Sequence, residues 1–130
     1  MTLAELRRAL SQAHPHWRVS PAGRLVVDVP LGHRHHRVRV REEDGWWAIE
    51  ARACHIPDLD EPPKVGDLAL QLLQASHDAE GLSFLREEDW VIVRAGSPPD
   101  AEVDEVATTV RYVARTADRW ELLWTGRDVL

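Results

Sequence analysis

The chain has 130 residues, enough for one hydrophobic core, and we expect residues 1–130 to form a single domain. Hydrophobic residues make up 44% and charged residues 29% of the sequence, which excludes a wholly disordered chain. The apolar runs are too short to cross a bilayer, the N-terminal residues lack the pattern of a secretory signal, and Cys54 has no second cysteine for an intrachain disulfide. We therefore expect a cytoplasmic protein without a membrane partner.

The net charge of −6 is unevenly distributed along the sequence. Eight arginines and two acidic residues fall within residues 1–41, whereas the rest of the chain carries 8 basic and 20 acidic side chains. The first part therefore has a net charge of +6 and the second a net charge of −12. The acidic total argues against general affinity for nucleic acid, which requires many phosphates to be neutralised together.

The first half of the sequence predicts one helix and then a sheet. Thr2 and Glu5 have the spacing of a capping box, and the helix that they begin ends at His14-Pro15. From residue 17 to residue 55 the apolar residues recur every second position, as in strands. Asp44-Gly45 is typical of a tight hairpin turn. These signals predict a three-stranded antiparallel meander.

The second half predicts a helix, a hairpin and a long final helix. Residues 66–79 are apolar on nearly every side of a helix, so that helix must be buried within the domain or against another chain. Residues 82–93 alternate as a β-hairpin. We expect the last helix to begin with Ser97 as its N-cap and to stop at Gly126. The order of elements predicts an α+β fold.

The stretch 81–96, which reads GLSFLREEDWVIVRAG, precedes a helix with an acidic start that runs through Ala117-Asp118 to Trp120. This arrangement resembles the class I type III secretion chaperone fold, and the C-terminal half is similar to the YbjN family, which shares that fold. The topology match covers nearly the whole chain and the sequence match residues 65–124. The His- and Arg-rich segment 33–41 departs from both families. The resemblance implies homodimerisation, binding of a protein client and no catalysis.

A search for catalytic and metal-binding motifs points the same way. His33 and His35 would share one face of a strand, but two ligands do not make a structural zinc site and the neighbouring arginines repel a cation. Cys54 and His55 would point to opposite faces of a strand, so the imidazole cannot act as a base for the thiol. We expect no enzymatic activity, no metal and no cofactor.

Arginines and tryptophans are the candidate binding residues. Arg37, Arg39 and Arg41 alternate along one strand face with Arg34 nearby, and this strip is either a solvated face with acidic neighbours or a partner-binding surface. As a binding surface it suits an acidic protein or, in an alternative function, nucleic acid bound by residues 34–41. Of two consecutive tryptophans on a strand, one must face away from the core. The predicted partner-binding residues are Trp46, Trp47, Arg34, Arg37, Arg39 and Arg41.

A homodimer would bury the second face of the apolar helix over residues 66–79, together with the strand of residues 90–93 as a sheet edge. The predicted dimer-interface residues are Leu68, Leu72, Ala75, Trp90 and Ile92.

Overall fold

The computed structural model describes residues 1–58, 74 and 81–125, which form two α-helices, a short 3-10 helix and six strands. In chain order the elements are α1 (Leu3–Ala13), β1 (Arg18–Val19), β2 (Leu25–Leu31), β3 (Arg34–Glu43), β4 (Trp46–His55), η1 (Ile56–Asp58), β5 (Ser83–Glu87), β6 (Trp90–Ser97) and α3 (Val103–Thr125). The helix predicted over residues 66–79, with Leu68, Leu72 and Ala75, lies outside the described residues.

The first helix forms as its capping signal predicts. The Thr2 hydroxyl accepts a hydrogen bond from the Glu5 backbone N–H at 3.1 Å, so one of the unpaired N–H groups of the first turn is satisfied. Leu6 and Leu10 are fully buried and attach α1 to the core. After the helix ends, the His14 ring stacks on Trp17, with 4.1 Å between the ring centroids.

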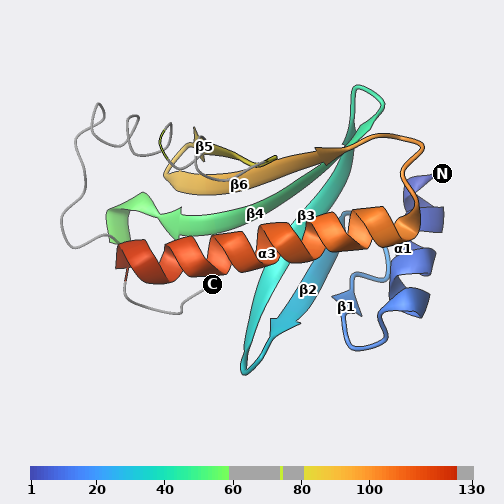
Figure 1. Cartoon of the computed structure of the whole chain (residues 1–130), viewed down its shortest axis with the longest axis horizontal. Helices are drawn as coiled ribbons and strands as arrows, with labels where there is room; N and C mark the ends of the chain where they lie inside the picture. Colours follow the sequence, from blue (N-terminus) through green and yellow to red (C-terminus); the bar gives the residue numbers. More distant parts are fainter. Residues whose placement is uncertain (59–73, 75–80, 126–130) are drawn as a thin grey trace.

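The six strands form one antiparallel sheet in the order β1-β2-β3-β4-β6-β5 (Figure 1). The predicted meander is β2-β3-β4, and its Asp44-Gly45 turn has positive φ at both residues, 52° and 81°, as a type I′ turn requires. The second hairpin returns to place β6 beside β4 and β5 outside it. The prediction of a sheet edge at residues 90–93 is therefore wrong, because β6 is paired on both sides. Among the described strands the edges are β1 and β5.

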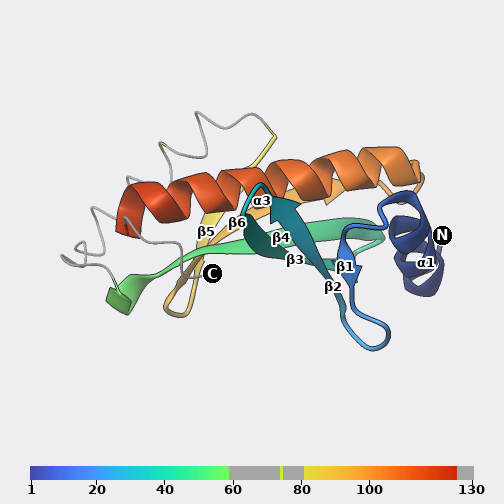
Figure 2. The same ribbon diagram turned by 90° about the horizontal axis from the view of Figure 1, so that it is seen from below.

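Helix α3 lies across one face of the sheet and contacts β2, β3, β4 and β6 (Figure 2). Its apolar stripe packs against the strand residues that point toward it, and both sets are almost completely buried. Each valine or isoleucine side chain among them contributes about 1.5–3 kcal/mol relative to its exposed state. The buried residues of the two layers include Val106, Val110, Val113, Ala117, Val27, Val38, Ile49 and Val93. None of the helices in the described ranges has the length and apolar character needed to span a bilayer.

The start of α3 differs from the sequence prediction. Ser97 is the last residue of β6 and is paired with Trp47 in the ladder, so it cannot serve as the N-cap of a helix. The helix begins at Val103, after a turn in which the Ala101 N–H donates to the Pro98 carbonyl. The predicted stop at Gly126 lies outside the described residues.

The sheet opens between β3 and β4. Their ladder runs from Glu43 and Trp46 at the hairpin to Arg39 and Glu50, and no residue pairs follow in the rest of these two described strands. Beyond that point His36 Nε2 donates a hydrogen bond to the Arg52 carbonyl at 2.7 Å, so a side chain takes the place of a backbone bond. A register shift between Arg52 and Cys54 bends β4 further. The two halves of the sheet therefore diverge, which shapes the face described next.

Candidate binding face of the sheet

The arginines of β3 are divided between the two faces of the sheet. Val38 and Val40 point toward α3 and are buried, so Arg37, Arg39 and Arg41 point to the opposite side, as predicted. We call this side the open face, because none of the described helices covers it. Arg34 does not belong to it: its guanidinium pairs at 2.5 Å with Asp118 on α3.

A buried carboxylate on the open face holds three arginines together. Glu50 of β4 is only 3% exposed and lies directly across the ladder from Arg39. Its carboxylate accepts from Arg39 at 2.9 Å and from the Nε of Arg41 at 2.9 Å, and it lies 3.3 Å from the Arg94 guanidinium. Three guanidinium groups and one carboxylate give this cluster, the Glu50 cluster, a net charge of +2.

The pKa shifts in the cluster follow from this geometry. Burial raises the pKa of Glu50, but the hydrogen bonds from Arg39 and Arg41 and the charge of Arg94 outweigh it, so the pKa lies below its ordinary value. Burial lowers the pKa of Arg41, but its hydrogen bond to Glu50 and the charges of Glu50, Glu43 and Glu87 raise the net value. Glu50 and Arg41 are therefore both charged at neutral pH.

Four other arginines of this face form no ion pair with any residue in the described ranges: Arg18, Arg24, Arg37 and Arg52. Arg37 lies across the ladder from Asp28, but the Asp28 carboxylate is turned to His35, 3.9 Å away. The Arg52 guanidinium lies over the Trp90 ring at 4.4 Å from its centroid, a cation–π contact. The open face thus carries positive charge beyond the Glu50 cluster.

A groove of about 830 Å³ crosses the open face. Arg18, Arg24 and Arg37 line it on the side of β1–β3, whereas Glu87 and Glu88 line it at the β5–β6 turn. The floor and far wall include the apolar side chains of Trp90 and Ile92. Asp28 also lines the side of β1–β3, so that side has three arginines and one carboxylate and is basic in sum, whereas the β5–β6 end is acidic.

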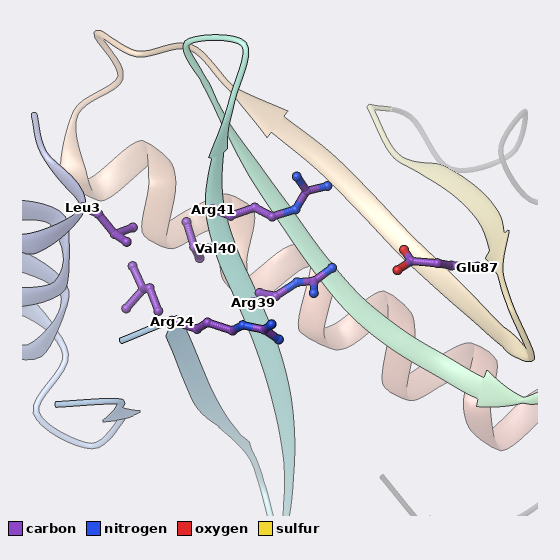
Figure 3. A pocket seen from close by; sticks show the side chains of 7 residues that line it. Leu3, Arg24, Arg39, Val40, Arg41 and Glu87 are labelled. Atoms are coloured by element: carbon purple, nitrogen blue, oxygen red, sulfur yellow. The ribbon is translucent and has the colours of Figure 1, made fainter. Parts of the chain in front are cut away.

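An adjoining hollow of about 460 Å³ extends this groove toward α1. Figure 3 shows the guanidinium groups of Arg24, Arg39 and Arg41 pointing across the sheet toward the Glu87 carboxylate, while Leu3 and Val40 close the apolar end. Because the arginines converge on one space, an anionic group placed there would meet several donors at once.

The two consecutive tryptophans separate as strand alternation requires. Trp47 is 3% exposed and belongs to the core, so its predicted place on a partner-binding surface is wrong. Trp46 is 53% exposed and lies on the open face beside Gly96. Its ring atom Cε3 would be 3.7 Å from a Cβ added to Gly96, which is van der Waals distance. Trp46 is thus the exposed aromatic residue of the open face.

The predicted dimer residues that the structure describes lie on the same face. Ile92 is 5% exposed and Trp90 is half-buried under Arg52, and both belong to an interior strand. They line the groove and do not form a sheet edge. Leu68, Leu72 and Ala75 lie outside the described residues, so the interface as a whole stays a prediction.

The histidines and the cysteine do not assemble into a site within the described residues. No group of three or more His, Cys, Asp or Glu side chains in that part of the chain is placed to hold a metal ion. His33 and His35 are exposed, whereas His36 is buried and bonded to the Arg52 carbonyl. Cys54 is also buried, so its thiol is not presented to a substrate from the open face.

Three residues of the open face were not predicted from the sequence: Glu50, Arg52 and Arg94. For Glu50 the sequence does contain a signal, the register of the strands on either side of the hairpin turn. A two-residue Asp44-Gly45 turn fixes the pairing of the flanking strands. Counting outward from that turn places Glu50 opposite Arg39, on the face of the arginines. Arg94 and Arg52 required knowledge that β6 returns beside β4, which no local pattern provides.

The fold resembles that of solved structures, whereas no protein-family model and no curated protein matches the chain. The structure of YbjN from E. coli, a proposed transcription regulator, matches with a TM-score of 0.67 and 15% identity over 95% of this chain and 90% of that chain. A chain of the heterodimeric complex ExoU–SpcU, from the type III secretion system of Pseudomonas aeruginosa, matches with a TM-score of 0.62 and 15% identity over 93% of this chain and 98% of that chain.

These matches confirm the predicted fold. The chain has the α+β fold of the YbjN and type III secretion chaperone-like class, with an N-terminal helix, an antiparallel sheet and a long C-terminal helix. At 15% identity the likeness concerns the fold alone.

Proposed function

We propose that the chain is a non-catalytic, chaperone-like or adaptor module that holds a protein client against the open face of its sheet. The observation that carries this proposal is the exposed Trp46 on the same face as an arginine-rich groove. The second of the matched structures is a heterodimeric protein complex, which supports a protein as the partner. The buried carboxylate of the face, Glu50, is engaged in structural ion pairs with three arginines, which supports binding over catalysis.

The physical basis is that of protein interfaces in general. Burial of a large aromatic side chain such as Trp46 contributes about 1.5–3 kcal/mol before the entropy lost on association. Tryptophan and arginine are also the residues that most often dominate binding energy. The arginines of the Glu50 cluster are about a third exposed, with 36%, 36% and 32% of the side chain accessible in Arg39, Arg41 and Arg94, so N–H groups remain for a partner.

The client proposal is tested by affinity capture with matched variants. Protein captured by the wild-type chain should be lost from Trp46→Ala and retained by Tyr112→Ala, because Tyr112 is 44% exposed but lies on α3. Thermal unfolding of both variants checks that the fold is intact. Equal capture by the two variants would contradict binding through the open face.

We further propose that the module is a cytoplasmic homodimer. The apolar character of residues 66–79, including Leu68, Leu72 and Ala75, supports a second buried face, and a lone cysteine is in keeping with a reducing compartment. Light scattering at micromolar concentration should give twice the monomer mass of 14.8 kDa. A strict monomer, with client capture retained, would remove the dimer and leave the binding proposal in place.

A further inference from the structure

We propose that the groove of the open face binds an extended, acidic protein segment, with its carboxylates on the basic side formed by Arg18, Arg24 and Arg37. This inference rests on the proposed protein-binding function and specifies its partner. It starts from the four open-face arginines that have no ion pair within the described residues, three of which form this side of the groove.

The spacing of the arginines suits a strand-like ligand. Successive same-face residues of a β-strand are about 6.6 Å apart, and the same repeat separates same-face side chains of an extended peptide. Arg37, Arg39 and Arg41 occupy three such positions on β3. A segment that carries acidic side chains at alternate positions can therefore place one carboxylate near each guanidinium, and the pair with Arg37, which has no ion pair in the described ranges, can become bidentate.

The Glu50 cluster makes the centre of the face, next to this basic side, rigid. An arginine side chain normally loses rotamer entropy when it is fixed by a ligand. Arg39 and Arg41 are already held by hydrogen bonds to a buried carboxylate, so part of that loss has occurred before binding. With Glu50 and the Glu43 carboxylate beside Arg41 both counted, the group keeps a charge of +1, which attracts an anion to the centre of the face.

The acidic end of the groove favours a peptide over nucleic acid. Glu87 and Glu88 line the groove opposite the arginines, and Glu87 faces them directly (Figure 3). A nucleic acid carries a phosphate at every nucleotide and would be repelled along this end. A peptide can carry carboxylates at one end and neutral or basic residues at the other, so Glu87 and Glu88 also fix the direction of binding.

The test uses fluorescence anisotropy with a labelled peptide of about twelve residues in which glutamate alternates with valine, a length that spans about 40 Å when extended. The same peptide with glutamine in place of glutamate and a single-stranded oligonucleotide of similar length serve as comparison probes. We expect the acidic peptide to bind at least about tenfold more tightly than the glutamine peptide, with an affinity that falls as salt rises.

Charge variants locate the binding. Arg24→Gln with Arg37→Gln should weaken the acidic peptide about tenfold, since each exposed ion pair contributes about threefold. Glu87→Gln should strengthen it about twofold, because a repelling charge is removed. Arg115→Gln on the outer surface of α3 removes one positive charge away from the groove and should leave the affinity unchanged.

Three results would overturn the inference: equal binding of the acidic and glutamine peptides, an equal effect of Arg115→Gln and of the double variant Arg24→Gln with Arg37→Gln, or tighter binding of the oligonucleotide than of the acidic peptide. If the acidic peptide fails while client capture still depends on Trp46, the protein-binding proposal stands and only the acidic ligand is rejected. If capture also fails, both are rejected.

Discussion

Replacement of Glu50 by glutamine tests whether the arginines of the open face depend on a single buried carboxylate. The substitution keeps the side-chain volume and removes the charge that binds Arg39, Arg41 and Arg94. Removal of one partner from a fully buried ion pair costs about 3–5 kcal/mol. Here the three arginines are about a third exposed, so water solvates part of the released charge.

We therefore expect Glu50→Gln to lower the free energy of unfolding by about 2–3 kcal/mol at pH 7. For a chain of this size that corresponds to a fall in Tm of about 10 °C. Urea unfolding followed by circular dichroism measures the free energy. Glu43→Gln is the matched control, because Glu43 contacts Arg41 at 3.0 Å but is 45% exposed, and it should cost no more than about 0.5 kcal/mol.

The pH dependence gives a second check on the same substitution. The pKa of Glu50 is lower in the folded chain than in the unfolded chain, so its stabilising contribution is complete above the unfolded pKa of about 4.3. The contribution is lost as the pH falls through the folded value. The gap in stability between wild type and Glu50→Gln should therefore narrow in acid. Two results would refute the reasoning. One is that Glu50→Gln lowers the free energy of unfolding at pH 7 no more than Glu43→Gln does. The other is that the difference in stability between wild type and Glu50→Gln widens as the pH falls.

Two further substitutions test other parts of the fold by thermal unfolding. Arg34→Ala should lower the free energy of unfolding by about 2–3 kcal/mol, because it leaves the buried Asp118 carboxylate without the Arg34 guanidinium. The double variant with Asp118→Ala should recover part of that stability. A double variant that is less stable than the sum of the two single effects would contradict this. Gly45→Ala should lower the free energy of unfolding by about 1 kcal/mol, since the φ of 81° at this position strains any residue with a Cβ. No neighbouring atom crowds the position, so the strain is in the backbone alone. An unchanged free energy of unfolding would show that the turn relaxes.

Local signals in the sequence were sufficient for most of the described elements. The Thr2 cap, the Asp44-Gly45 turn and strand alternation each act over a few residues, so they predicted α1, the meander and the side on which Arg37 lies. The serine-proline signal at Ser97 favours a helix cap, whereas pairing with Trp47 extends the strand through it. Tertiary pairing overrides a local propensity in such a case.

The binding face was predicted only in part, because its charges meet across strands that are distant in sequence. Arg94 reaches Glu50 over a ladder between β4 and β6, which follows from the return of the second hairpin and not from any local pattern. Arg34 was assigned to the arginine strip by proximity, but its partner Asp118 is 84 positions away. Such pairs are fixed by topology, so a single sequence does not reveal them.

The short ladder between β3 and β4 has a mechanical consequence. Because the backbone ladder between these strands ends at Arg39 and Glu50, with the His36 hydrogen bond to the Arg52 carbonyl beyond it, the sheet consists of two panels, β1-β2-β3 and β4-β6-β5, that meet along a seam. Helix α3 packs against strands of both panels and so holds them together across the seam. The angle between the two panels therefore depends on the buried side chains by which α3 packs against both of them. Substitutions on that buried surface would change the shape of the groove without changing any residue that lines it.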